Sequence, residues 1–489
     1  MKFPLRHGPT ALAALTALAA AAALTGCASP GGIAPTHQPL AAVPAPAADD
    51  APAWPDPARD GSAWADWHDS ALDRLIAQAI ARQPSLQIVQ LRLEQAQAQV
   101  DAAGAAAGPQ AGFGGSLSDQ RFTKNGLYPP PYGGGLYWNN NLQLNASWEF
   151  DLFGRQRAAL AAAIGQQRAA QAEAQAASML LAANLASGYV DLARALELHR
   201  LAQDAVAERE KVLAIVRARV DAGLDNAVDA RQAEGAVAQA RLQAAAADEQ
   251  IARGRHALAE LSGQGPNALD ALSPALAPLR SRALPQGLPF NLLGRRADVV
   301  AQRWRVEAAA RGVDVARARF YPDFNLSAFW GLSSLSLAKL LQAGSQTYGL
   351  GPAISLPVFD GGALRANLTA KAADVDIAVE NYNATLLRAW RETADEVSNL
   401  RTIESQQREQ AAALEAAESA FALAQQRYRA GLGNFLVVLT AESNVLAQRR
   451  GAADLKARHL QAEVALSRAL GGGVHAADPV TASAEVQAP

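Results

Sequence analysis

The sequence predicts a mainly α-helical fold with a small transmembrane β part, in which copies of the chain form a trimeric tube with an α-barrel and a β-barrel. Three observations predict it. Two very long stretches have a helical pattern, the two halves of the chain repeat each other, and four short segments alternate apolar and polar side chains. The composition agrees, because 50% of the 489 residues are hydrophobic but only 6% are aromatic, which suits thin, closely packed helices.

Residues 1–26 are predicted to be a signal peptide. Lys2 and Arg6 precede an Ala/Leu-rich run from 11 to 24 that is too short to span a bilayer comfortably. The run ends in Leu24-Thr25-Gly26-Cys27, which resembles a bacterial lipobox. We therefore expect Cys27 to carry an S-diacylglycerol and an N-acyl chain such as palmitate. The alternative is an ordinary secretory peptide followed by an incidental cysteine.

Residues 27–71 are expected to form a lipidated tether and an equatorial segment. Ala28, where an aspartate would favour the inner membrane, indicates the outer membrane by resemblance to bacterial lipoproteins. Cys27 is the only cysteine, which excludes a disulfide within the chain and a cysteine-based zinc site. The net charge of −2 argues against a nucleic-acid partner, because neutralising phosphates requires a basic excess or patch. Downstream of the signal peptide no run reaches about 18 consecutive apolar residues, so strands are expected to cross the membrane.

Two copies of one unit are predicted, at residues 72–263 and 295–471. At a constant spacing, Ala222-Gly223-Leu224 matches Ala430-Gly431-Leu432, and Gly263 matches Gly471. Matches that include glycine at chain breaks are poorly explained by chance similarity among Ala-rich helices. Residues 264–294 are then a linker or equatorial segment, and residues 472–489 are a C-terminal tail.

Each unit is expected to run helix, strand pair, very long helix, tight turn, helix. Residues 363 to 429 contain neither proline nor glycine, and their larger side chains recur every 3.6 residues. Residues 155 to 221 are equivalent in the first unit, with Gly165 and Gly188 as weak points. The flanking helices, predicted at 72 to 107 and 227 to 262, are about half as long, so two of them stacked end to end match one long antiparallel helix. A filament-like coiled coil is the alternative, but it leaves the strands unexplained.

The predicted strands have one apolar and one polar face. Alternation is clear at 142–150, 324–332 and 348–358 and weaker near 112 to 122, and residues 124 to 138 resemble an external loop. This pattern suits a half-buried soluble sheet or an outer-membrane barrel, and the lipobox favours the barrel. Four strands cannot close a barrel alone, and eight strands leave an interior that side chains largely fill. Three chains give twelve strands and an open lumen, which indicates conduction.

The chain resembles the outer membrane factor family of TolC-like channels, particularly the lipidated OprM/NodT-type efflux subunits, over essentially residues 27 to 473. The resemblance rests on five segments: Trp64-Ala65-Asp66-Trp67, Trp148-Glu149-Phe150-Asp151-Leu152-Phe153-Gly154-Arg155, Leu292-Leu293-Gly294-Arg295-Arg296-Ala297-Asp298, Phe359-Asp360-Gly361-Gly362 and Arg427-Tyr428-Arg429-Ala430-Gly431-Leu432. It implies a homotrimer in the cell outer membrane that extends into the periplasm. It also implies tips that meet a periplasmic adaptor, which links them to an inner-membrane transporter of the RND or another class.

The resemblance also implies the site residues. Adaptor contacts are expected at Gly223, Leu224, Gly431 and Leu432, and a channel gate at Asp225, Asp229 and Tyr428.

The chain departs from the family pattern at three positions. Ala297 replaces a usual proline, and Val437 and Thr440 stand where relatives often carry gate carboxylates. An acidic ring would therefore be built from Asp225 and Asp229, although both acids could equally be helix N-terminal residues. Asp151 and Asp360 are interpreted as helix caps, and Tyr428 either ties neighbouring helices together or packs at the turn.

The sequence carries no enzymatic signature, so no catalytic residue, metal site or cofactor is expected beyond the lipid on Cys27. The predicted function is passive conduction of small toxic compounds or drugs from an inner-membrane pump to the outside. A conduit for type I protein secretion and a non-conducting structural lipoprotein are the alternatives.

Overall fold

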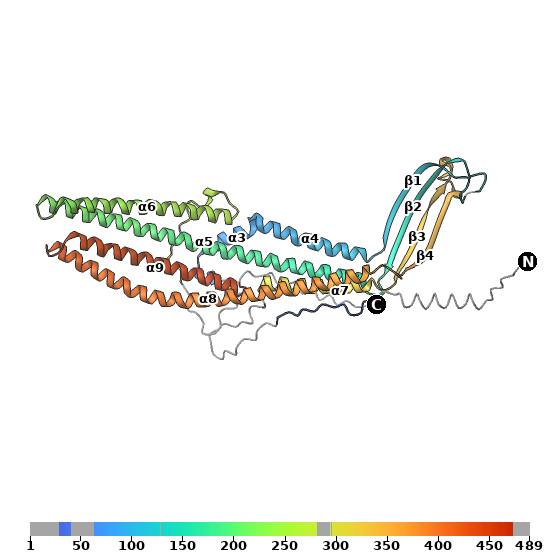
Figure 1. The fold of residues 1–489 in the computed structure, drawn as a ribbon. Coiled ribbons are helices and arrows are strands. Elements are labelled where there is room, and N and C mark those ends of the chain that lie inside the picture. The colour runs from blue at the N-terminus through green and yellow to red at the C-terminus, as the bar shows by residue number, and fades with distance from the viewer. Residues whose placement is uncertain (1–28, 41–62, 128, 281–293, 295, 473–489) are drawn as a thin grey trace, which may run out of the picture. The chain divides into compact units, whose positions relative to one another are not determined.

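The computed structural model describes residues 29–40, 63–127, 129–280, 294 and 296–472 (Figure 1). The signal peptide, Cys27 and the C-terminal tail from residue 473 lie outside the described residues. The chain divides into two compact units. Of the described residues, one unit comprises 29–39, 93–127, 129–170 and 302–383, and the other comprises 40, 63–92, 171–280, 294, 296–301 and 384–472. Each unit is described by itself.

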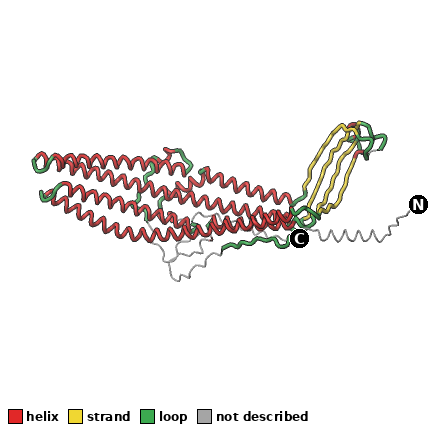
Figure 2. The backbone as a smooth tube through the Cα atoms, in the orientation of Figure 1, coloured by secondary structure: helices red, strands yellow, loops and turns green. Residues whose placement is uncertain are grey.

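The described elements are mainly helical, with one sheet (Figure 2). In chain order the first half contains α3 (Ser70–Arg82), α4 (Pro84–Ala106), β1 (Gln110–Arg121), β2 (Leu136–Phe150), α5 (Arg155–Asp221) and α6 (Ala227–Leu261). The second half contains α7 (Ala297–Ala318), β3 (Asp323–Ser334), β4 (Gln346–Ser355), α8 (Ala363–Arg429) and α9 (Phe435–Ala469). Both α5 and α8 have 67 residues, and both α6 and α9 have 35. The predicted mainly helical fold with four strands, and the predicted element order of the two repeats, are confirmed.

Three details differ from the sequence expectation. The first helix is broken into α3 and α4, because Gln83 adopts an extended backbone before Pro84, which opens the next helix. The strand β2 begins at Leu136, so the end of the expected external loop is part of the sheet. Gly165 is a point of close packing in an unbroken helix, since a Cβ there would lie 2.9 Å from the Cβ of Ala308.

The sheet lies in the first unit and has the strand order β1-β2-β3-β4, with antiparallel pairing throughout. Register partners share a face. One row across all four strands consists of Phe113, Leu144, Trp330 and Tyr348, which are 72%, 48%, 54% and 77% exposed. The adjacent row, on the opposite face, consists of small or polar residues: Gly114, Gln143, Gly331 and Thr347. The sheet therefore presents a broad exposed apolar face, as the alternation predicts.

All four junctions between strands and helices lie at one end of this sheet, and the two strand–strand connections lie at the other. At the helical end, Asp151 accepts hydrogen bonds from the backbone N–H groups of Gln156 and Arg157, and Asp360 accepts from Gly362 and Leu364. Both aspartates therefore satisfy first-turn N–H groups, which confirms the capping interpretation.

In the second unit, the short helices meet end to end at repeated glycines. Gly263, with φ 68°, follows α6 and lies so close to α3 that a Cβ would be 3.1 Å from the carbonyl oxygen of Arg82. Gly471, with φ 84°, follows α9 in the same way, and a Cβ there would be 3.1 Å from Cα of Arg296. Glycine readily adopts the left-handed conformation that ends each helix, and the absence of a Cβ lets the backbone of the next helix approach closely. The predicted end-to-end stacking is therefore present at both repeats.

The main core of the second unit surrounds the middle of α5. Trp64 and Trp67, from the short 3-10 helix Ala63–Trp67, are 4% and 6% exposed and join this core. The Tyr189 hydroxyl donates to Asp69, 2.7 Å away, and Asp69 in turn caps α3. Among the described helices, α5 alone has an 18-residue window that is long and apolar enough to cross a membrane, and 56% of that window is buried. More than half of the window therefore packs inside the helical core, which indicates a core helix rather than a membrane span.

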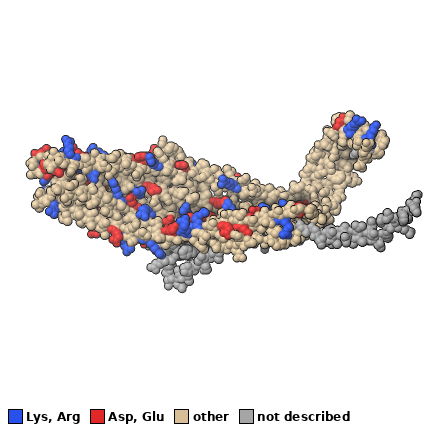
Figure 3. Space-filling view, viewed as in Figure 1, with Lys and Arg blue, Asp and Glu red and all other residues tan. Residues whose placement is uncertain are grey.

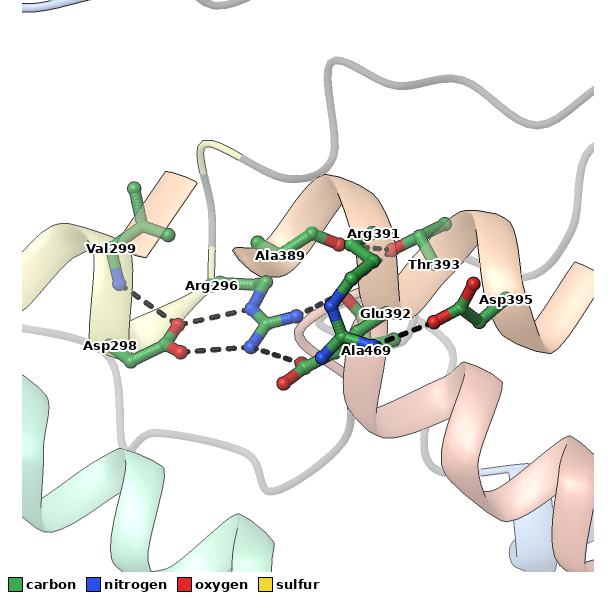
Figure 4. A network of polar contacts seen from close by, with 9 residues as sticks. All are labelled: Arg296, Asp298, Val299, Ala389, Arg391, Glu392, Thr393, Asp395 and Ala469. Atoms are coloured by element: carbon green, nitrogen blue, oxygen red, sulfur yellow. Dashed lines mark hydrogen bonds and ion pairs between the residues drawn. The ribbon is translucent and has the colours of Figure 1, made fainter. Parts of the chain in front are cut away.

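A buried arginine fastens the start of α7 to the middle of α8 and to the end of α9 (Figure 4). Arg296, which is 8% exposed, donates to both carboxylate oxygens of Asp298, to Glu392 on α8 at 2.9 Å and to the carbonyl oxygen of Ala469 on α9 at 3.2 Å. Ala297 is the first helical residue beside this network, a position where proline is also readily accepted. The loss of the usual proline therefore leaves the helix start intact.

Candidate functional site at the helical tips

The two hairpin tips are built by the same backbone motif. After α5, Gly223 adopts φ 70°, its N–H donates to Val220, and the Leu224 N–H donates to Arg219. After α8, Gly431 adopts φ 72°, its N–H donates to Tyr428, and the Leu432 N–H donates to Arg427. These are the paired bonds of a Schellman motif, which needs a left-handed residue and so favours glycine.

The leucine of each tip turn is unusually exposed. In a Schellman motif this residue commonly packs back on its own helix. Here Leu224 is 66% exposed and Leu432 is 71% exposed. Each tip turn therefore presents an exposed leucine to its surroundings.

Asp225 joins the two hairpins. Its carboxylate accepts hydrogen bonds from Arg219 Nε at 2.9 Å and Nη2 at 3.2 Å, both from its own hairpin. The Tyr428 hydroxyl, from the other hairpin, donates to the same carboxylate at 2.6 Å. The Arg219 guanidinium also lies 4.8 Å from the centre of the Tyr428 ring. Of the two readings that the sequence leaves open for Tyr428, this bond favours a tie between helices.

The electrostatics keep this contact in one protonation state. The hydrogen bond from Arg219 lowers the pKa of Asp225 below its ordinary value of 3.8, and the Tyr428 hydroxyl adds to the effect. Burial, followed by the bond to Asp225, raises the pKa of Tyr428 above its ordinary value of 10.0. At neutral pH the carboxylate is therefore ionised and the phenol is protonated, as the bond requires.

Asp229 has a different environment, because it completes a capping box at the start of α6. The Asn226 side chain accepts from the N–H groups of Val228 and Asp229, and the Asp229 carboxylate accepts from the Asn226 N–H at 3.4 Å. In the second hairpin Asn434 caps α9 in the same way, but Val437 stands at the equivalent of Asp229. A gate role for Asp229 stays a prediction beside this capping role.

The two hairpins also pack against each other behind the tips. A core cluster combines Val212 and Val216 of α5 with Tyr428, Phe435 and Val438 of the second hairpin. Beside this cluster lies a cavity of about 320 Å³, which Glu208 of α5 and Gln425 of α8 help to line. The Gln425 side chain donates a hydrogen bond to Glu208 at 3.1 Å, which adds another link between the hairpins.

Farther from the tip, a buried ion pair links three helices. The Arg209 Nε of α5 lies 3.1 Å from Glu442 of α9, and Arg209 also donates to the carbonyl oxygen of Ala236 on α6. These two charged side chains are 10% and 6% exposed. The tip contact is therefore the outermost of several links between the hairpins.

A shallow apolar groove lies on the second hairpin near its tip. It measures about 390 Å³ and is lined by Ala417 and Ala420 of α8 and by Leu436, Val437 and Thr440 of α9, among others. Leu436 and Val437 are 53% and 55% exposed. The positions that lack the expected carboxylates thus contribute to an apolar surface.

Sequence reasoning missed Arg219, the cation that neutralises Asp225. The repeat offers a signal for it, because Arg219 matches Arg427 whereas Asp225 matches Gly433, which has no side chain to pair. A comparison of the two repeats therefore shows that the first tip carries a carboxylate that the second lacks, which identifies it as a candidate ion-pair site. Among the described residues, no three His, Cys, Asp or Glu side chains are grouped to hold a metal ion.

Comparison with known proteins agrees with this architecture. The family described as outer membrane efflux protein matches residues 75–264 and 288–472. The multidrug resistance outer membrane protein MdtP of Escherichia coli O6:H1 is 32% identical over 422 residues, which cover 85% of this chain and 86% of that protein.

Solved structures give the same result. The outer membrane protein VceC of Vibrio cholerae matches with a TM-score of 0.79 at 34% identity, covering 84% of this chain and 99% of that one. The open state of the MtrE outer membrane channel of Neisseria gonorrhoeae matches with a TM-score of 0.78 at 26% identity, covering 90% of this chain and 98% of that one.

Paired long helices, two glycine-turned tips and a sheet with an exposed apolar face define the class of outer membrane channel proteins. The chain belongs to the outer membrane efflux protein family. It is a subunit of an outer membrane efflux channel.

Proposed function

We propose that three copies of this chain close one passive conduit for small toxic compounds, within a tripartite system that includes a periplasmic adaptor and an inner-membrane pump. The observation that carries the proposal is the incomplete sheet. β1 and β4 are its two edges, and each edge offers unpaired backbone groups beside an exposed apolar face. In a bilayer such edges are satisfied only when the sheet closes on itself.

The number of copies follows from the size of the lumen. Two chains would give eight strands, whose interior side chains fill the space, while three chains give twelve strands around an open lumen. Inward-facing residues such as Gly114 and Gly331 are small, which favours a free passage.

The N-terminal arm supports a lipid anchor on Cys27. The backbone N–H groups of Thr36 and His37 donate to Asp376 of α8, each at 2.9 Å. Arg365, in the first turn of α8, donates to the carbonyl oxygen of Ser29 at 2.5 Å. Because two residues of chain span at most about 7 Å, Cys27 stays within reach of the helix start that follows β4. An acyl chain there would enter the same membrane as the sheet.

The tips suit the predicted adaptor contact and gate. Leu224 and Leu432 are exposed apolar residues on rigid turns, and the groove beside Leu436 extends the apolar surface. The Tyr428–Asp225 bond holds the hairpins together, so its release accompanies opening. MdtP is named a multidrug resistance protein, which favours drug efflux over protein secretion.

Deletion of the gene, followed by a susceptibility panel of amphipathic toxins, tests the proposal. Loss of the chain should lower the tolerated concentrations severalfold, and the wild-type chain should restore them. A Leu432→Asp chain should form conducting trimers in lipid but fail to restore tolerance, because its adaptor contact is lost. Unaltered susceptibility in a strain without redundant channels would overturn the proposal, and a secretion defect instead would indicate protein export.

A further inference from the structure

The charged residues of the sheet differ between its two ends. At the helical end, Arg155 pairs with Glu149 and Asp323, and Arg157 pairs with Asp151. At the opposite end, three basic residues are exposed: Arg121 ends β1, Lys124 lies in the β1–β2 connection, and Lys339 lies in the β3–β4 connection. Within the described residues, none of these three forms an ion pair. Figure 3 shows charge gathered at that end while the strands are almost free of it.

These cations lie next to exposed apolar side chains. Arg121 is the register partner of Leu136, which is 64% exposed, so both side chains lie on the apolar face of the sheet. Lys339 is flanked by Leu337 and Leu341, which are 50% and 79% exposed. The surface therefore combines a basic rim with an apolar band directly beside it.

The Lys124 side chain has a defined path. Gly134, with φ 92°, lies beneath it, and a Cβ at Gly134 would be 2.6 Å from Lys124 Cε. The aliphatic part of the Lys124 side chain thus packs over Gly134, and its ammonium group extends beyond the glycine into the surroundings. Asp119 is the one acid near this rim on β1, and it does not pair with the three bases.

We propose that this basic rim binds the phosphate groups of the acylated glycolipid in the outer leaflet, while the neighbouring apolar band contacts its acyl chains. The inference rests on the proposed membrane placement of the sheet, in which the strand–strand connections face outward. A phosphorylated lipid satisfies both halves of the surface, since cations near a membrane attract anionic head groups. Three chains would supply nine such bases around the outer rim.

Native mass spectrometry of the detergent-solubilised full-length assembly, titrated with bisphosphorylated lipid A, tests the proposal. The triple variant Arg121→Gln, Lys124→Gln, Lys339→Gln should bind this lipid about ten to a hundred times more weakly. The charge-retaining control Arg121→Lys, Lys124→Arg, Lys339→Arg should bind it like the wild type. Fully dephosphorylated lipid A should bind the wild type as weakly as the bisphosphorylated lipid binds the triple glutamine variant.

Several outcomes would overturn the proposal. One is equal binding by the wild type and the glutamine variant, and another is equal binding of the two lipids by the wild type, which needs no variant to fold. Displacement by millimolar inorganic phosphate would assign the rim to free anions instead. A changed ion selectivity with unchanged lipid binding would assign it to the pore mouth. Assembly mass and conductance, measured on the same samples, test the proposed channel separately from lipid binding.

Discussion

Asp225 accepts hydrogen bonds from Arg219 on its own hairpin and from Tyr428 on the other. The two partners act differently. The Arg219 guanidinium stabilises the ionised form of the carboxylate, and the Tyr428 hydroxyl links it to the neighbouring hairpin. Asp229, four residues away, is engaged with the backbone of its own helix. Two acids that look alike in the sequence are therefore placed differently.

The Tyr428→Phe substitution tests the tie between hairpins. It removes one hydrogen bond to a charged group and little volume, so the open-to-closed ratio of single channels in a planar bilayer should rise about tenfold. Tyr189→Phe removes an equivalent hydroxyl–carboxylate bond, to Asp69, within the core. This control should leave gating unchanged, and equal effects of the two substitutions would contradict the tie.

The pKa shifts predict that this tie is insensitive to pH across the neutral range. The lowered pKa of Asp225 means that its contribution is lost only as pH falls through a value below 3.8. The raised pKa of Tyr428 means that its contribution is lost only as pH rises above 10.0. Closed-state conductance should therefore be constant between about pH 5 and 9. A gating transition near neutral pH that Tyr428→Phe abolishes would contradict this expectation.

The sequence could single out Asp225 and Tyr428, but it could not show that they touch. They are far apart in the chain and meet only because the tip turns of two repeats lie side by side. Arg219 and the Arg209–Glu442 pair were missed, since a pattern of charges on a helix does not show which arginine turns inward. Which arginine on a helix forms a buried ion pair depends on which face of that helix packs against its neighbour.

The helices are the elements that the sequence predicts best. α5 and α8 have the predicted bounds, because a long run with 3.6-residue periodicity and few glycines leaves little alternative. The break at Pro84 was missed, since proline at the first position of a helix is compatible with a helical pattern. Strand ends were less well placed, because backbone pairing extends β2 beyond its alternating residues.

The joint between α7, α8 and α9 depends on Arg296. Arg296→Met leaves Asp298 and Glu392, whose side chains are 41% and 23% exposed, without their cation, so the free energy of unfolding should fall by about 1.5 to 3 kcal/mol. Arg391→Met, which breaks an exposed ion pair with Asp395 in the same region, should cost no more than about 1 kcal/mol. Thermal or denaturant unfolding in detergent measures both, and similar losses would contradict the role of Arg296.

The two faces of the sheet can be tested with adjacent residues of β2. Leu144 lies on the exposed apolar face and Gln143 on the opposite one. Leu144→Arg should impair membrane insertion, because a lipid-facing arginine near the midplane costs about 2 to 4 kcal/mol per chain. Gln143→Arg should insert normally and change only ion selectivity. Heat-stable assemblies in outer membrane fractions report insertion, and a reversed pattern would show that the faces are misassigned.

At the scale of the whole molecule, one duplicated unit has diverged at its ends. Both repeats keep the long helix, the glycine turn and the glycine junction at Gly263 or Gly471. The tips differ, because only the first carries Asp225 with its arginine, and only the second carries Tyr428. The elements that both repeats share thus form the helical scaffold. The residues in which the tips differ form the contact that joins the two hairpins.

The edges β1 and β4 make a single chain incomplete in a membrane, so other copies of the chain must close the sheet. Native mass measurement of the protein extracted in mild detergent tests this most directly. We expect one assembly with the mass of three chains, visible as rings by electron microscopy. A stable, monodisperse monomer that resides in the outer membrane and conducts would contradict the account.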